Sequence, residues 1–424
     1  MYTGRASSPS APKISTIPRR NASHHRWIVL AVGGAAQASF SVAFTGLPVA
    51  GVLMRSAYQM STEQLGFVLG CMALGVTFSE IVWGLITDVF GDRRVLLTGL
   101  LSTCVVLLAM AMFMVPSDGA APGYLLLGAC LVLVGVLSGS VNSSSGRAIM
   151  GWFTDEKRGL AMSIRQTAIP AGGAIGAALT PWLAHSFGFK AVFAVFAAIY
   201  ALSALLTWLW LHEHEAPAAT ASSTSVPAQD RSPLKRLDIW RLAIASGLLT
   251  VPQIAVLTFG GIFLHDTKAA DLVTISAAII VVQIVGSIAR IALGMRADRG
   301  SDRRKLVRDT GVLTALAAGA LATLTNAPML WVLPLVCLCG VLASAWHGVA
   351  YTEIAVMAGA KRSGTALGII GMTIFASASI TPALISLTIA KASWQATWAM
   401  VALAALVAVS LAPTKLAGRG SLKK

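Results

Sequence analysis

Long runs of apolar residues dominate the chain, and short clusters of polar or charged residues separate them. A run of about 20 apolar residues is long enough to cross a membrane as a helix, because each helical residue advances about 1.5 Å. The pattern therefore predicts twelve membrane-spanning helices, over residues 27–52, 64–87, 95–115, 123–151, 160–184, 190–211, 241–264, 272–296, 309–326, 329–358, 365–390 and 395–412.

A charged phrase occurs twice between these runs, as GLITDVFGDRR from Gly84 to Arg94 and as GMRADRGSDRR from Gly294 to Arg304. The copies lie 210 residues apart in a chain of 424 residues, and a Lys-Arg pair recurs at 157–158 and 361–362. The sequence therefore predicts two related six-helix halves. We expect a cytosolic tail over 1–26, an N-terminal bundle over 27–211, a cytosolic linker over 212–240, a C-terminal bundle over 241–412 and a second tail over 413–424.

The composition agrees with an all-α membrane protein. Hydrophobic residues make up 56% of the chain and charged residues 12%, whereas a soluble domain carries about 25% charged residues. No phosphate-binding glycine loop, hydrolase triad or metal-ligand spacing occurs in the sequence. We therefore expect no enzymatic activity, no cofactor and no bound metal.

The net charge of +15 is distributed unevenly across the predicted spans. Basic residues fill both tails and the loops on one side, and the opposite loops hold only Arg55, Lys190, Lys268 and Lys391. Positive residues mark the cytosolic side, so both termini are expected in the cytosol, with the protein in the plasma (bacterial inner) membrane. A charge spread over so many separate loops does not indicate nucleic-acid binding.

The repeated phrase resembles the loop after helices 2 and 8 of the major facilitator superfamily, a family of twelve-helix transporters. Five positions of its Gly-x-x-x-Asp-x-x-Gly-x-Arg-Arg pattern match in the first copy, at Gly84, Asp88, Gly91, Arg93 and Arg94. The second copy matches at Gly294, Asp298, Arg303 and Arg304, with Ser301 where the family has its second glycine.

The resemblance implies that both aspartates form a cytosolic gate. Asp88 and Asp298 would each cap a helix of the opposite half, beginning near Gly364 and Gly159 respectively, and would thereby favour an outward-open state. Arg147 is expected to be a structural partner of Asp88. The alternative is that these residues are ordinary solvated loop charges.

Five ionisable residues fall inside the predicted spans, namely Glu80, Arg147, Arg165, Arg290 and Glu353. Each costs at least about 2.5 kcal/mol at membrane depth, so each should face a partner, a cavity or a substrate. The helical rise places all but Arg147 about 9 to 12 Å from the cytosolic end, in one layer. Glu353 and Glu80 are candidates for proton coupling, with simple ion pairing as the alternative.

Arg290 stands four residues before Gly294. In this position it resembles the helix 8 arginine of the monocarboxylate-porter and oxalate/formate branches of the superfamily. In those branches it binds the substrate carboxylate, and the segment around Arg165 also resembles their helix 5. Gly286 stands where animal monocarboxylate porters have an acid, so the match is incomplete. Arg165 and Arg290 could instead form a gate with Glu80 or Glu353.

Other polar residues are candidates for lining a substrate cavity. His347 lies about 21 Å from the cytosolic end, in a string that suits either a cavity wall or a structural role. In the resembling fold helices 1, 4, 7 and 10 line the cavity, and three of these helices carry the amides Gln37, Asn142 and Gln253.

These observations favour uptake of a small organic anion, preferably a monocarboxylate, by alternating access with proton symport. The protein is expected to act as a monomer whose partners are this anion, protons and membrane lipid. The alternative is a proton-driven efflux antiporter for apolar compounds, although the helix 5 phrase Ile169–Gly173 lacks the leading glycine usual in efflux members. A membrane sensor that moves nothing is a third class, but no large extramembrane domain supports it.

Overall fold

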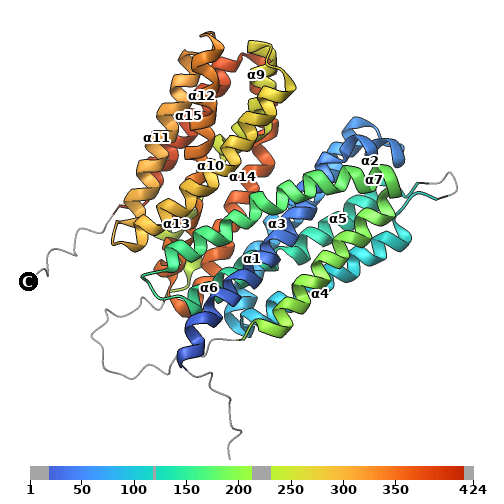
Figure 1. Cartoon of the computed structure of the whole chain (residues 1–424), viewed down its shortest axis with the longest axis vertical. Coiled ribbons are helices and arrows are strands. Elements are labelled where there is room, and N and C mark those ends of the chain that lie inside the picture. Colours follow the sequence, from blue (N-terminus) through green and yellow to red (C-terminus); the bar gives the residue numbers. More distant parts are fainter. Residues whose placement is uncertain (1–18, 118–120, 213–230, 415–424) are drawn as a thin grey trace, which may run out of the picture.

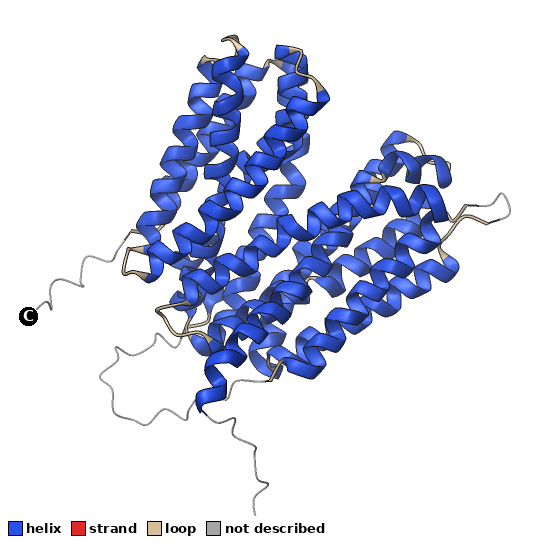
Figure 2. Cartoon of the chain, viewed as in Figure 1, coloured by secondary structure: helices blue, strands red, loops and turns tan. Residues whose placement is uncertain are grey.

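The computed structural model describes residues 19–117, 121–212 and 231–414, and every regular element in these residues is helical (Figure 2). The N-terminal half comprises α1 (Arg19–Val49), α2 (Gly51–Ala57), α3 (Thr62–Phe90), α4 (Asp92–Phe113), α5 (Tyr124–Ser138), α6 (Ser140–Trp152) and α7 (Arg158–Trp210). The C-terminal half comprises η1 (Pro233–Lys235), α8 (Leu237–Ile254), η2 (Ala255–Phe259), α9 (Gly260–Lys268), α10 (Leu272–Asp298), α11 (Arg303–Thr323), α12 (Met329–Ala345), α13 (His347–Ala358), η3 (Ala360–Arg362), α14 (Ser363–Lys391) and α15 (Trp394–Leu411).

Eleven stretches in the described residues are helical, long and apolar enough to cross a membrane. One of them, α7, has 53 residues, which corresponds to about 80 Å, far more than the roughly 30 Å of a hydrocarbon core. Its backbone leaves helical geometry at Gly188, where φ is 72° and ψ is 179°. Counting α7 as two crossings gives twelve, so the predicted twelve-helix membrane fold is confirmed.

Several boundaries differ from the sequence prediction. α1 begins at Arg19, ahead of the expected start at residue 27, and the short helix α2 follows it. The seventh crossing contains a π-helical turn, η2, which begins three residues after Pro252. Proline cannot donate its backbone hydrogen bond, and such turns accommodate a locally widened helix. Most of the expected tails and linker, at residues 1–18, 213–230 and 415–424, lies outside the described residues.

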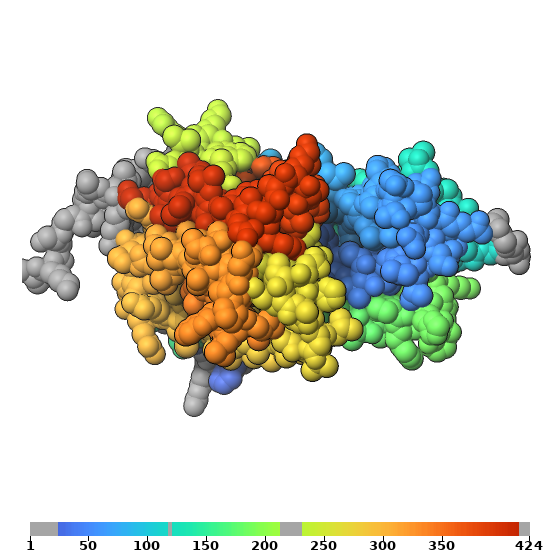
Figure 3. All heavy atoms as spheres, turned by 90° about the horizontal axis from the view of Figure 1, so that it is seen from above, coloured from blue at the N-terminus to red at the C-terminus, as the bar shows by residue number. Residues whose placement is uncertain are grey.

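The two halves meet at one end of the molecule and diverge toward the other (Figure 1). We call the end where α3 and α10 finish the motif side, because the repeated phrase lies there. The opposite end, which carries α2 and α9, is the far side. Viewed from the far side, the halves lie next to one another as separate groups of helices (Figure 3).

Three buried apolar clusters follow this arrangement. One lies almost entirely within the N-terminal half, and one lies toward the far side of the C-terminal half. The third combines Ile149 and Met162 of the N-terminal half with Trp346 and Leu367 of the C-terminal half. The apolar core is therefore shared between the halves mainly at the motif side.

The outer surface is apolar, as expected for contact with lipid. Phe78, Val89, Phe113 and Leu272 are all at least 75% exposed on helices of membrane-spanning length. Large exposed apolar areas are rare on soluble monomers.

The break in α7 generates a testable prediction. Gly188→Ala should lower the stability by about 1 to 3 kcal/mol, because its backbone conformation is essentially restricted to glycine. The apparent Tm of the detergent-solubilised protein measures this effect. Gly34→Ala is the matched control, since both glycines have open space where a Cβ would stand and only Gly188 has a positive φ. An unchanged Tm for Gly188→Ala would show that the chain does not need this break.

Candidate functional site

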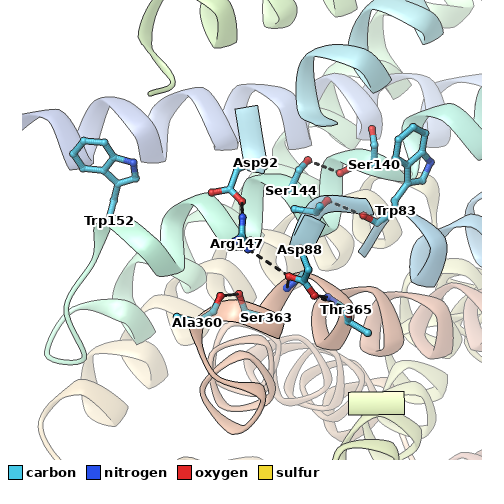
Figure 4. A network of polar contacts seen from close by, with 12 residues as sticks. Trp83, Asp88, Asp92, Ser140, Ser144, Arg147, Trp152, Ala360, Ser363 and Thr365 are labelled. Carbon is cyan, nitrogen blue, oxygen red and sulfur yellow. Dashed lines mark hydrogen bonds and ion pairs between the residues drawn. The ribbon is translucent and has the colours of Figure 1, made fainter. Parts of the chain in front are cut away.

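The carboxylate of Asp88, near the end of α3, lies against the first turn of α14 in the opposite half. Its Oδ1 accepts a hydrogen bond from the backbone N–H of Gly364 at 2.8 Å. Its Oδ2 accepts from the backbone N–H and the hydroxyl of Thr365, at 2.8 and 2.5 Å. The first N–H groups of a helix lack partners within the helix and carry partial positive charge, so a carboxylate stabilises them. Figure 4 shows Asp88 facing Thr365.

The second copy of the phrase makes the equivalent contact. Asp298, at the end of α10, accepts hydrogen bonds from the backbone N–H groups of Gly159 and Leu160, both at 2.8 Å. These two residues open α7 in the N-terminal half. Both helix-cap contacts expected from the sequence are therefore present, and each joins the two halves at the motif side.

Paired glycines allow the helices to approach closely enough for these contacts. A Cβ atom on Gly84 would lie 2.5 Å from the carbonyl oxygen of Gly364, and one on Gly294 would lie 2.5 Å from that of Gly159. Real Cβ atoms essentially never come so close to another heavy atom. Each motif glycine also stands one helical turn before its aspartate, so both residues face the same neighbouring helix.

The missing glycine at Ser301 is explained by a shift of one residue. In the first copy Gly91, with φ 88°, turns the chain from α3 directly into α4. In the second copy the positive φ, 92°, falls on Gly300 instead. Asp302 then caps α11, accepting from the backbone N–H of Arg304 at 3.1 Å.

Arg147 on α6 connects two acidic residues of the first motif. Its Nη1 lies 2.5 Å from Asp92 Oδ1, and its Nε lies 3.4 Å from Asp88 Oδ1. The expected contact with Asp88 is thus present, but Asp92 is the closer partner (Figure 4). Both of these ion pairs lie within the N-terminal half, and one of them involves the carboxylate that caps α14.

The motif arginines have different environments. Arg93 donates to the carbonyl of Trp208 at 2.7 Å, within the N-terminal half. Arg303 donates to the carbonyl of Asp155 at 3.3 Å, which crosses between the halves. Arg94 is exposed. Among the described residues, Arg303 is therefore the one of these three arginines with a hydrogen bond between the halves.

Glu353 is paired with the fourth motif arginine. Its Oε1 lies 2.6 Å from Nε of Arg304, whose side chain reaches from the start of α11 to α13. No hydrogen bond or ion pair in the described residues joins Glu353 to Glu80, Arg165 or Arg290. The structure thus separates Glu353 from the other charges with which its predicted depth grouped it.

Arg165 on α7 lies at the centre of a polar cluster in the N-terminal half and is fully buried. Its Nη2 donates to Gln37 Oε1 at 2.8 Å, and to the carbonyl and side-chain oxygens of Asn142 at 2.7 and 3.0 Å. Its Nε donates to Ser145 Oγ at 3.0 Å. Its Nη1 has no hydrogen-bond partner among the described residues.

Asn142 links this arginine to a buried acid and to the other half. Its Nδ2 lies 3.3 Å from Glu80 Oε2 and 3.4 Å from the hydroxyl of Tyr351 on α13. Glu80 is fully buried, and its Oε1 has no hydrogen-bond partner in the part of the chain that the structure describes. α14 passes close by at Gly371, where a Cβ would lie 2.6 Å from the Glu80 carboxyl group.

Arg290 lies on the buried face of α10, which faces the interface between the halves. The buried residues of this helix follow the spacing of one helical face, namely Ala278, Val282, Gly286, Arg290, Gly294 and Ala297. Arg290 Nε donates to the carbonyl of Ser344 at 3.0 Å, and its Nη1 donates across the interface to the carbonyl of Gln166 at 2.5 Å.

His347 shares a partner with this arginine. Its Nδ1 lies 3.2 Å from the same Ser344 carbonyl, and its ring stacks on Trp346 with the ring centroids 3.8 Å apart. A carbonyl oxygen only accepts, so Nδ1 carries the proton in this contact and Nε2 is left for another partner.

Sequence reasoning found some members of the cluster and missed others. The structure brings Gln37, Asn142, Arg165 and Glu80 together, whereas Gln253 is half-buried on α8 with no hydrogen bond to them in the described residues. Four contributors were missed: Ser145, Gln166, Ser344 and Tyr351. Tyr351 stands one turn after His347, so helical spacing could have identified it, but Gln166 and Ser344 contribute backbone carbonyls, which no side-chain pattern reveals.

Taken together, the polar cluster around Arg165 and the neighbouring residues around Arg290 have an excess of positive charge and unsatisfied polar atoms. Within the described ranges the hydrogen bonds of Arg290 go to backbone carbonyls, and no ion pair joins either arginine to an acid. The buried polar atoms without a partner in those ranges include Glu80 Oε1, Arg165 Nη1, Ser163 Oγ, Ser344 Oγ and both amide atoms of Gln166. Such atoms are costly to bury, so the arrangement is suited to an additional polar or anionic partner.

Comparison with known proteins identifies relatives along nearly the whole chain. The family model described as Major Facilitator Superfamily matches residues 27–382. An uncharacterized MFS-type transporter of Mycobacterium tuberculosis, Rv2994, is 29% identical over 392 residues, which cover 92% of this chain and 85% of that protein. A crystal structure of the transporter FucP in the outward conformation has a TM-score of 0.69 at 16% identity, covering 92% of this chain and 98% of that one.

Two further relatives have names that point to different substrates. Probable anion transporter 3, chloroplastic, of Oryza sativa is 27% identical over 163 residues, covering 38% of this chain and 30% of that protein. A multi-drug resistance efflux pump PmrA homolog of Lactococcus lactis is 26% identical over 249 residues, covering 57% of this chain and 58% of that protein.

The helix-cap contacts generate a prediction about access from the motif side. Asp88→Asn should raise the alkylation rate of a cysteine placed at Ser363 about two- to fivefold, because losing a carboxylate at a helix N-terminus costs about 0.3 to 1 kcal/mol. The rate is measured with a membrane-impermeant maleimide, and the parent protein provides the background of native cysteines. Asp309→Asn, which alters an exposed pair with Lys305, is the control. Equal rates in both variants would argue against a gate at Asp88.

Proposed function

The chain belongs to the Major Facilitator Superfamily, and from this premise we propose that it is a secondary transporter for a small organic anion, preferably a monocarboxylate, coupled to protons. Transport proceeds by alternating access of a site between the two halves. The protein acts in the plasma (bacterial inner) membrane as a monomer, with both termini in the cytosol. The anion transporter among the relatives supports this substrate class.

The observation that carries the proposal is the environment of Arg290. This buried guanidinium contacts two backbone carbonyls, and no carboxylate in the described residues neutralises it. A buried cation without a counter-charge is costly unless a ligand supplies the negative charge. Arginine suits a carboxylate because its planar fork can donate two parallel hydrogen bonds.

Arg165 provides a second positive group from the opposite half. It precedes Gln166, whose carbonyl accepts from Arg290, so this hydrogen bond brings the guanidinium of Arg290 to the turn of α7 that carries Arg165. The free Nη1 of Arg165 is a ready donor for an anion. His347 offers Nε2 and belongs to the C-terminal half, as Arg290 does. The substrate site would therefore combine residues of both halves.

Proton coupling is assigned to Glu80 in preference to Glu353. An anion that enters a cell against an inside-negative potential pays about 2.3 kcal/mol per 100 mV, which co-transport of one proton offsets. Glu80 is buried beside the proposed anion site and linked to Arg165 through Asn142. Substrate binding at Arg165 would change the electrostatic field at Glu80, and this change could couple the two ions. Glu353 forms an ion pair with Arg304 and fits a gating role.

The arrangement of the halves supports a state that is closed on the motif side. The contacts of Asp88 and Asp298 close the motif side, and the halves diverge toward the far side (Figure 1). With both termini in the cytosol, the closed end is the cytosolic mouth. Opening it requires both carboxylates to leave their helix N-termini.

A proton-driven efflux antiporter for apolar compounds is the second candidate. The efflux pump homolog among the relatives favours it. The cluster of two buried arginines suits an anion better than an uncharged or cationic drug, because it leaves positive charge unpaired. The following measurements distinguish the two candidates.

Arg290→Lys should reduce carboxylate uptake into proteoliposomes at least tenfold, because lysine keeps the charge but loses the bidentate geometry. Uptake of a labelled panel of carboxylates is measured with an inward proton gradient, and empty liposomes give the passive background. Arg299→Lys, at an exposed position just beyond α10, is the matched control. Undiminished uptake of every acid by the Arg290 variant would rule out its role, and export of apolar compounds alone would favour the efflux candidate.

Glu80→Gln should abolish the stimulation of uptake by a proton gradient while preserving exchange of anion for anion, because glutamine cannot exchange a proton. The ratio of gradient-driven uptake to exchange measures coupling independently of protein amount. Glu353→Gln should keep this ratio close to that of the wild type. Loss of coupling in the Glu353 variant alone would assign the proton to the other acid.

A further inference from the structure

Three phenylalanine rings meet across the interface between the halves. Phe40 and Phe44 lie one turn apart on α1 and stack with a centroid separation of 5.2 Å. Phe375 on α14 meets both edge to face, at 5.6 Å from Phe40 and 5.5 Å from Phe44. We call these residues the aromatic triad.

The triad lies next to the polar cluster, on the side away from the gate. Phe40 and Phe44 follow Gln37 by three and seven residues, so they share its helical face about 4.5 and 10 Å farther along α1. Phe375 likewise follows Gly371, which approaches Glu80, by one turn of α14. From the motif side to the far side, the interface therefore carries the caps, then the charged groups, then the rings.

The burial of the triad links the two halves at this level. Phe40 is 3% and Phe375 is 9% exposed, whereas Phe44 is half-buried. Phe375 is the only residue of the C-terminal half in the buried cluster that fills the described N-terminal half. Its ring therefore packs against the N-terminal half, which must move relative to α14 during alternating access.

We propose that the aromatic triad is the apolar subsite of the anion site, and that the transported class is carboxylates with an apolar alkyl or aryl body. This inference rests on the proposed function. The carboxylate would meet Arg290 and Arg165, and the body would extend toward the far side against the rings. Aromatic rings reward apolar and aryl surface, whereas a hydroxylated body would lose hydrogen bonds to water without replacing them.

Competition experiments with the full chain in proteoliposomes test the proposal. Transport of labelled benzoate is defined as the component that protein-free liposomes lack, which removes passive diffusion of the neutral acid. Unlabelled hexanoate, acetate and a hexuronate then compete for this component. The wild type should be inhibited by hexanoate at concentrations at least tenfold lower than by acetate or the hexuronate.

Phe375→Ala should reduce the ratio between the inhibitory concentrations of acetate and hexanoate about tenfold. Phe375→Leu, which keeps apolar volume, should reduce this ratio less. Phe44→Ala, at a half-buried position, provides a second test if Phe375→Ala does not fold, and thermal unfolding monitors both. Phe113→Ala removes a ring that is 75% exposed and is the matched control, with the ratio unchanged.

The outcomes distinguish failure of the inference from failure of the proposed function. A wild type that carries carboxylates without a preference for apolar bodies overturns the inference and leaves the proposed function standing. The same holds if the preference persists in folded variants of both Phe375 and Phe44. If the wild type carries no carboxylate, the proposed function fails and the inference fails with it.

Discussion

Where the two halves meet, one polar contact recurs beside the apolar cluster that both halves share: a carboxylate placed on the first N–H groups of a helix that belongs to the other half. Asp88 and Asp298 each make it, in geometrically matching ways. Such a contact contributes about 0.3 to 1 kcal/mol, rising to about 2 when partly buried. Together with the shared apolar cluster, the two caps favour this orientation of the halves, and both must break when the halves separate at this end.

The duplicated scaffold places different chemistry at equivalent positions. Glu80 and Arg290 each stand four residues before a motif glycine, and each helix face that carries them is pressed against the opposite half. Under the proposed function, one half contributes the proton-binding group and the other contributes the principal anion-binding group. Relative motion of the halves would then change the surroundings of both ions together, which is what coupled transport requires.

The features that could be predicted from the sequence are those set by local rules. The length of the apolar runs determined the twelve crossings, and the repeated aspartates one turn after a glycine indicated both caps. The partner of Glu353 could not be predicted, because Arg304 reaches it with a long side chain from a different helix. The hydrogen-bond partners of Arg165 could not be predicted either, because they lie on α1 and α6 and come together only when the helices pack. The shift from Ser301 to Gly300 was hidden because a loop can move a turn by one residue without changing the contacts on either side.

The single buried stripe of α10 has a consequence for the surrounding bilayer. Six of the 27 residues of that helix are buried, and Ile280, Ile284 and Ile288 are at least 56% accessible on the face away from Arg290. That face is available to acyl chains, and a mismatch between helix length and hydrocarbon thickness costs fractions of a kcal/mol per Å. Because Arg290 is part of this helix, a change in the thickness of the host membrane would shift the position of its guanidinium relative to the other residues of the site.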